Sequence, residues 1–144
     1  MTQHRTSDGS LRWRSLWQTI GALLVALVIY LSLTPDPITL PGANGDKGGH
    51  VLAYATLMFW FAQLDLRLRR RIAWATTFVA MGIALEFVQR AIGYRSFEVL
   101  DMLAGACGVA VGWLAAPPRL PNLLREVEAR TPALLHRMIP SRGR

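Results

Sequence analysis

The sequence predicts an all-α protein, an integral membrane bundle of four transmembrane helices with both termini on the cytoplasmic side. Of its 144 residues, 52% are hydrophobic and only 17% are charged, whereas about 25% of the residues in ordinary soluble domains are charged. Long apolar segments alternate with short polar ones. The formal net charge is nevertheless +7, which suits a lipid-embedded body with basic cytoplasmic edges. We therefore expect a membrane partner and no nucleic acid.

The first predicted span covers residues 16–33 and contains no charged residue. At about 1.5 Å per residue it is roughly 27 Å long, close to the thickness of the hydrocarbon core. Arg12 and Arg14 precede it, as basic residues precede a signal peptide, but no A-x-A-like cleavage site follows. We expect an uncleaved anchor.

Three further spans are predicted at residues 50–64, 72–92 and 99–116, each flanked by charges or by Gly and Pro. Residues 1–116 then form one transmembrane domain. Residues 117–144 form a basic tail with short amphipathic pieces, which we expect to lie on the inner leaflet through its leucines and arginines.

The arginines predict the orientation, because short basic loops stay in the cytoplasm. They occur before the first span, between the second and third spans, and in the tail. Outside the tail these are Arg5, Arg12, Arg14, Arg67, Arg69, Arg70 and Arg71. The two other loops carry only Lys47 and Arg95, so we expect Gly42 and Tyr94 to face outward.

Polar residues recur at the predicted outer ends of the spans. Lys47, His50 and Tyr54 follow Asp46 at offsets of 1, 4 and 8, which lie on one helical face. Glu86 and Gln89 stand near the outer end of the third span, Arg95 follows in the loop, and Asp101 opens the fourth span. A carboxylate within hydrocarbon is costly unless it faces the bundle interior and finds a donor. The sequence therefore predicts one outer pocket for these residues.

Small residues continue along the fourth span. Gly105, Gly108 and Gly112 follow Asp101 at offsets of 4, 7 and 11, again on one face. Such glycines let helix backbones pack closely, and a substrate groove lined by them is the alternative. Gly48 and Gly49 at the start of the second span could let a backbone or a phosphate approach.

The polar set admits several interpretations. It can be a purely structural network that locks the helices together. Alternatively, His50 can exchange protons near neutral pH, with Glu86 and Asp101 as its partners. A histidine and two carboxylates can also hold a divalent metal, but these three lie on three helices without compact ligand spacing. We expect neither a metal nor another cofactor.

Two blocks of this sequence resemble the VanZ-like membrane proteins, a family named for an accessory protein of teicoplanin resistance. The first block is D-K-x-x-H-x-x-x-Y, and the second is E-x-x-Q followed by a basic turn, an acid, and an aspartate with trailing glycines. Their residues are Asp46, Lys47, His50 and Tyr54, then Glu86, Gln89, Arg95, Glu98, Asp101, Gly108 and Gly112. Together the blocks span residues 45–113. Gly105 stands where the family commonly has asparagine.

The resemblance implies a small inner-membrane protein that acts on the cell-envelope surface or on lipid-linked cell-wall material. Fifteen arginines against one lysine suggest a GC-rich bacterial genome. We expect a site for an anionic lipid or lipid-linked envelope precursor, with catalytic positions His50, Glu86 and Asp101. Its substrate-binding positions would be Asp46, Lys47, Tyr54, Gln89 and Arg95. The alternative is a non-catalytic protein that binds a partner in envelope biogenesis, and the sequence does not decide whether the protein is an enzyme.

Overall fold

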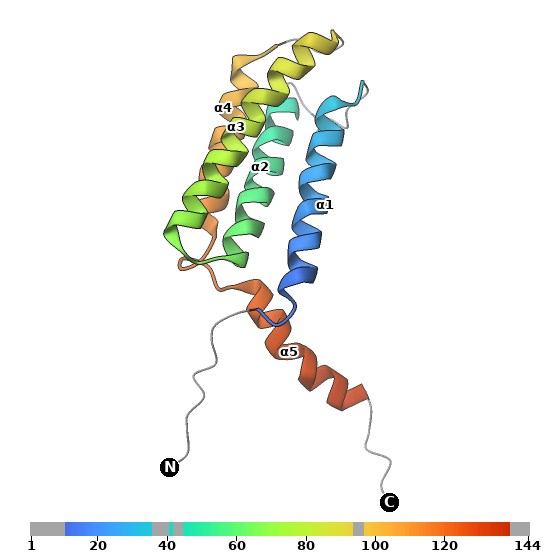
Figure 1. Cartoon of the computed structure of the whole chain (residues 1–144), viewed down its shortest axis with the longest axis vertical. Coiled ribbons are helices and arrows are strands. Elements are labelled where there is room, and N and C mark those ends of the chain that lie inside the picture. The colour runs from blue at the N-terminus through green and yellow to red at the C-terminus, as the bar shows by residue number, and fades with distance from the viewer. Residues whose placement is uncertain (1–10, 36–40, 42–44, 94–96, 139–144) are drawn as a thin grey trace, which may run out of the picture.

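The computed structural model describes residues 11–35, 41, 45–93 and 97–138, with side chains as far as residue 131. These residues form five α-helices and no strand, so the predicted all-α class is confirmed. The helices are α1 (Arg14–Leu33), α2 (Gly45–Leu64), α3 (Leu68–Ile92), α4 (Val99–Ala115) and α5 (Leu123–Met138). In Figure 1, α1 to α4 stand side by side, and α5 lies below them. We call the end where α2 and α4 begin the upper end of the bundle, and the end where α1 and α3 begin the lower end.

Two of the helices, α1 and α3, are long and apolar enough to cross a membrane, by length and composition. Only 11% of the apolar window of α1 and 22% of that of α3 is buried inside the bundle, unlike the core helix of a soluble protein. The helix α4 is apolar but shorter, with 17 residues. Gly21 of α1 packs against Trp60 and Phe61 of α2, so α1 is part of the bundle.

The closest helix contact joins α2 and α4, which run in the same direction (Figure 1). A methyl group on Gly108 would lie 2.5 Å from the carbonyl oxygen of Val51, and one on Gly112 would collide with the carbonyl oxygen of Ala55. The two backbones therefore touch where no side chain intervenes. The close packing predicted from these glycines is confirmed.

The core lies between α2 and its neighbours. Tyr54, Leu57 and Met58 of α2 are almost completely buried. One turn below, the Phe61 ring lies against Trp74 and Phe78 of α3, with ring centroids 4.3 and 5.3 Å away. Such tilted and edge-to-face aromatic pairs add to the stabilisation from apolar burial. The helix α2 thus carries the largest share of the core side chains.

One arginine that was counted for orientation is built into the fold. Arg71, at the start of α3, is only 6% exposed. Its guanidinium donates hydrogen bonds to the carbonyl oxygens of Pro117 (2.5 Å) and Trp113 (3.2 Å) and lies 4.7 Å from the centroid of the Trp113 ring. Since α4 ends there, Arg71 joins the lower ends of α3 and α4.

The helix α5 is attached to the lower end through Glu128. Its carboxylate accepts hydrogen bonds from the backbone N–H groups of Arg12 (2.7 Å) and Trp13 (2.8 Å) and from the indole N–H of Trp17 (2.8 Å). Burial alone would raise the pKa of Glu128, but these bonds outweigh it and lower the pKa. The carboxylate is therefore ionised at neutral pH. Where the sequence predicted short amphipathic pieces, the structure has a helix whose first half is tied to the bundle.

The contact between α2 and α4 predicts the effect of a single methyl group. We expect Gly108→Ala to cost about 1–3 kcal/mol of unfolding free energy, because the methyl group would meet backbone that cannot turn away. Gly49→Ala is the matched control, since no described atom outside its own helix backbone and chain neighbours lies within 4 Å of the added methyl group. Unfolding of both variants in mixed micelles measures the difference. Equal stabilities would show that α2 and α4 are not in backbone contact.

Candidate functional site

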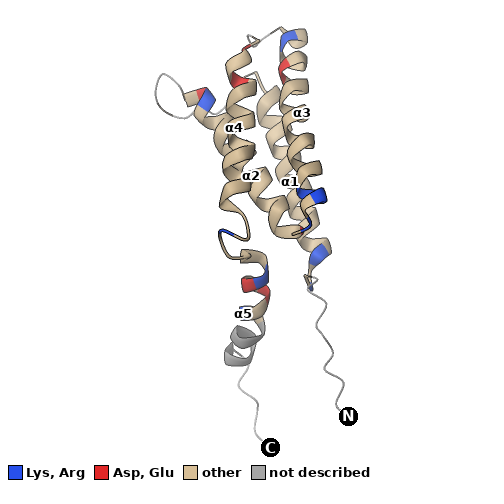
Figure 2. Ribbon diagram, turned by 90° about the vertical axis from the view of Figure 1, so that its left-hand side faces the viewer, with Lys and Arg blue, Asp and Glu red and all other residues tan. Residues whose placement is uncertain are grey.

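Charged residues gather at the two ends of the bundle, and the middle of α1 to α4 is free of them (Figure 2). At the upper end, α2 and α4 contribute a group of side chains that we call the polar cluster. It consists of Asp46, Lys47, His50, Glu98 and Asp101. Asp46, Lys47 and His50 belong to the first turns of α2, and Asp101 to the first turn of α4.

Asp101 connects the members of the polar cluster. Its Oδ1 lies 3.7 Å from Nζ of Lys47, and its Oδ2 lies 3.7 Å from Nε2 of His50. Lys47 also donates a hydrogen bond of 2.9 Å to Oε2 of Glu98, the residue that precedes α4. Two side chains of α2 thus face two acidic residues at the start of α4.

Exposure increases outward across the polar cluster. The side chain of Asp101 is 4% exposed, that of His50 15%, and that of Lys47 31%. A buried carboxylate therefore lies beneath a histidine and a lysine that solutes can reach from the upper end.

Tyr54 lies beneath His50 and away from the surface. It is 2% exposed, and its ring is nearly parallel to the imidazole of His50, with centroids 6.4 Å apart. Methyl groups on Gly82 or Gly105 would lie within 3.2 Å of the Tyr54 side chain. Both glycines therefore make room for the ring, which supports His50 from below. Tyr54 was predicted to bind substrate, but the structure places it in the core under the polar cluster.

Glu86 and Gln89 of α3 are also buried, and both bind backbone. Glu86 accepts a 3.1 Å hydrogen bond from the N–H of Glu98, and Gln89 donates a 2.7 Å bond to the carbonyl oxygen of Ser32. They therefore connect α3 to the start of α4 and to the end of α1. Arg95, with Gly42 and Tyr94, lies outside the described residues.

Glu98 belongs to the polar cluster, although its place in a motif was all that could be predicted for it from the sequence. The available signal was its position, three residues before Asp101 in the acidic turn that precedes α4. One helical turn separates the two carboxylates, so both can face the same lysine.

The upper end carries more carboxylates than cations among the described residues. The carboxylates are those of Asp46, Glu86, Glu98 and Asp101, and the cations are Lys47 and Arg90. Arg90 lies at the end of α3, with its guanidinium 5.6 Å from the centroid of the Phe97 ring. Among the described residues, therefore, a further cation at this end would favour the approach of an anion.

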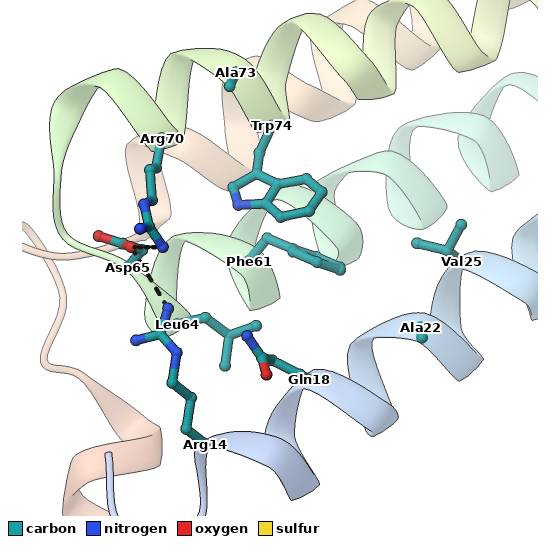
Figure 3. A pocket seen from close by; sticks show the side chains of 10 residues that line it. All are labelled: Arg14, Gln18, Ala22, Val25, Phe61, Leu64, Asp65, Arg70, Ala73 and Trp74. Carbon is teal, nitrogen blue, oxygen red and sulfur yellow. Dashed lines mark ion pairs between the residues drawn. The ribbon is translucent and has the colours of Figure 1, made fainter. Parts of the chain in front are cut away.

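A cavity of about 660 Å³ opens at the lower end, between α1, α2 and α3 (Figure 3). Its wall is mostly apolar, with Val25, Phe61 and Trp74 among the lining residues. At its edge, Asp65 forms ion pairs of 2.9 Å with Arg70 and 3.6 Å with Arg14. An apolar wall of this kind suits a hydrocarbon chain, and the Asp65 carboxylate is already paired with two arginines. The polar cluster is therefore the better candidate for binding polar groups or for proton transfer.

No family model, no curated protein and no solved structure matches the chain.

The hydrogen bond between Glu86 and the N–H of Glu98 predicts how substitutions of Glu86 change the free energy of unfolding. Glu86→Ala leaves the partly buried N–H of Glu98 without this acceptor, which we expect to cost about 1–3 kcal/mol. Glu86→Gln keeps a carbonyl oxygen of the same reach and should lose less than half as much. Unfolding in mixed micelles measures both. An equal loss in the two variants would mean that the charge of Glu86, and not its hydrogen bond to α4, is what the fold requires.

Proposed function

We propose that this chain is a multi-pass protein of the bacterial inner membrane. Its polar cluster faces outward and binds the phosphate of an anionic lipid or of a lipid-linked envelope precursor. The observation that carries this proposal is the arrangement at the upper end of an apolar bundle. There the buried carboxylate of Asp101 positions Lys47 and His50, which remain partly exposed.

Four membrane spans are supported by the outer surface of the bundle as well as by α1 and α3. On α4, Leu100, Leu103 and Leu114 are each more than half exposed, and on α2 Leu52 is 60% exposed. Burying one such side chain is worth about 1.5–3 kcal/mol. Leaving these side chains in water would forgo that free energy, whereas surrounding hydrocarbon would not. We therefore assign α2 and α4 as spans too.

The orientation rests on the arginines at the lower end. Arg71 is part of the fold, which leaves Arg67, Arg69 and Arg70 as exposed residues that can act as topogenic charges. The segment before α1 and the segment after α4 add further arginines at the same end. The lower end would therefore be cytoplasmic, as would both termini.

Lys47 is the described cation best placed to bind a phosphate. It is bonded to Glu98, whose side chain is 41% exposed, so a phosphate oxygen can replace that carboxylate when the Glu98 side chain turns outward. An exposed ion pair of this kind contributes little to stability. Arg95, three residues before Glu98 in the sequence, would supply a second donor.

His50 would transfer protons if the protein catalyses a reaction. Its Nε2 faces Asp101 at 3.7 Å, whereas Glu86 is bonded to the backbone of Glu98. Asp101 is therefore the better candidate for orienting the imidazole, and Glu86 acts through the position of α4. In this proposal Glu86 is a positioning residue and not a catalytic one.

The rival proposal, a polar set that only locks the helices, has support at particular residues. Glu86, Gln89 and Arg71 are buried and bonded to backbone atoms of neighbouring helices. These contacts already connect α3 to α1 and α4. Lys47 and His50 are more exposed and add little to such a lock, which favours a binding role for them.

The resemblance to VanZ-like proteins fits the same proposal. Its motif positions Asp46, Lys47, His50 and Asp101 are members of the polar cluster. Gly105, where the family commonly has asparagine, adjoins the ring of Tyr54, another of the motif positions. We propose a role at the envelope surface for this chain, and the resemblance implies glycopeptide resistance as one setting for it.

Orientation can be tested by labelling single cysteines in intact cells. In a Cys107→Ser background, a cysteine that replaces Arg69 should react with a membrane-impermeant maleimide only after lysis, because its loop is cytoplasmic. A cysteine that replaces Gly42 should react in intact cells. Labelling of the Arg69 position from outside would overturn the outward placement of the polar cluster.

Lipid binding can be tested with the single lysine. We expect Lys47→Gln to weaken binding of a polyprenyl phosphate or of phosphatidylglycerol about tenfold, because a charge-assisted hydrogen bond is worth about 1.5–3 kcal/mol. Arg69→Gln, which removes an equal charge from the lower end, is the control and should bind normally. Native mass spectrometry of the purified variants counts the bound lipid. The two lipid probes distinguish an envelope precursor from bulk phospholipid, and equal loss in both variants would contradict the proposed site.

A further inference from the structure

Three side chains of the polar cluster have the chemistry of metal ligands. Asp46 and His50 are four residues apart on one face of α2, and Asp101 faces them from α4. One potential ligand atom of each lies within 4.8 Å of the other two, and Nε2 of His50 and Oδ2 of Asp101 are 3.7 Å apart. This trio differs from the one that the sequence suggested, because Asp46 takes the place of Glu86.

The spacing suits a small divalent ion. In a tetrahedral site with bonds of about 2.1 Å, ligand atoms are about 3.4 Å apart. The His50–Asp101 pair already has nearly this separation, and the Asp46 side chain, which is only partly buried, can close the rest by rotation. One imidazole and two carboxylates are an ordinary ligand set for Zn²⁺, and three protein ligands leave a fourth position open.

Asp101 supplies an independent indication of a ligand. It is 96% buried, and its Oδ1 has no hydrogen-bond partner among the described residues. Among the described residues, Nζ of Lys47 forms an ion pair of 3.7 Å with this oxygen, but its hydrogen bond goes to Oε2 of Glu98. A buried carboxylate normally has its lone pairs satisfied, because the desolvation cost is otherwise uncompensated. A metal ion bound within the trio would compensate it.

The charge of the upper end also favours a bound metal ion. Its described carboxylates outnumber Lys47 and Arg90, so an added cation would favour the binding of a phosphate there. A divalent ion reverses the local field and offers its open position to a phosphate oxygen.

We propose that Asp46, His50 and Asp101 bind a divalent transition-metal ion, Zn²⁺ in the first instance, that holds the phosphate of the lipid ligand. The role toward phosphate rests on the proposed function, whereas metal binding itself does not. With the metal bound, Lys47 neutralises the charge of Glu98. It also lies beside the metal site and helps to bind the phosphate.

Zinc binding is measured first without lipid. The full chain, purified in detergent and stripped with a chelator, is titrated with Zn²⁺ in a calorimeter. We expect one equivalent to bind, and we expect His50→Gln and Asp46→Asn each to weaken the affinity tenfold or more, since each removes one ligand. The control replaces the two other histidines, His4→Gln and His136→Gln, and should leave the affinity unchanged. Asp46 is partly exposed, so its variant tests the site even if Asp101→Asn does not fold.

Absence of binding by Zn²⁺ and by Mn²⁺ would overturn the inference, as would binding that persists in His50→Gln and Asp46→Asn. A second titration with polyprenyl phosphate, with Zn²⁺ present or chelated, separates the two proposals. Zinc binding without lipid binding would contradict only the proposed function. Lipid binding that is equally strong after chelation, in a chain that binds no zinc, would contradict only the metal site.

Discussion

The upper-end site depends on the backbone contact between α2 and α4. Gly108 lies against Val51 and Gly112 against Ala55, so the two parallel helices keep a fixed register over one turn. Side chains of a helix tilt toward its N-terminus, and both helices begin at the upper end. This register sets the first turns of α2 and α4 side by side, and there Nε2 of His50 lies 3.7 Å from Oδ2 of Asp101. Without the glycines the helices would separate and the carboxylate would lose its distance to the imidazole.

Buried polar residues connect the helices, whereas partly exposed ones are available to a ligand. Glu86, Gln89 and Arg71 bind backbone atoms of neighbouring helices and fix α3 against α1 and α4. In contrast, Lys47 and His50 remain partly exposed above the buried Asp101. Carboxylates outnumber cations there among the described residues, so an added cation would favour phosphate binding. A metal ion between α2 and α4 would also add a second connection across the glycine contact, so ligand binding and helix packing would be coupled.

Helical spacing was sufficient to predict that Asp46, Lys47 and His50 share a face and that Gly108 and Gly112 pack against another helix. It did not predict the partners of Glu86 and Gln89, because the spacing within α3 does not determine how that helix is rotated relative to α4. Arg71 was interpreted as a loop charge, since nothing local indicates that Trp113 and Pro117 would surround it. Lys47 and Glu98 are 51 residues apart along the chain. Their hydrogen bond likewise depends on the register between α2 and α4, which local sequence does not indicate.

X-ray absorption at the zinc edge of the zinc-loaded chain tests the central claim most directly, because the spectrum reports the ligands of the bound ion. With three histidines in the chain, the number of coordinated imidazoles distinguishes the proposed site from binding elsewhere. The account predicts one imidazole nitrogen with oxygen ligands at about 2.0–2.2 Å, and loss of the imidazole signal in His50→Gln. A first shell with two or more imidazoles, or with none, would contradict it.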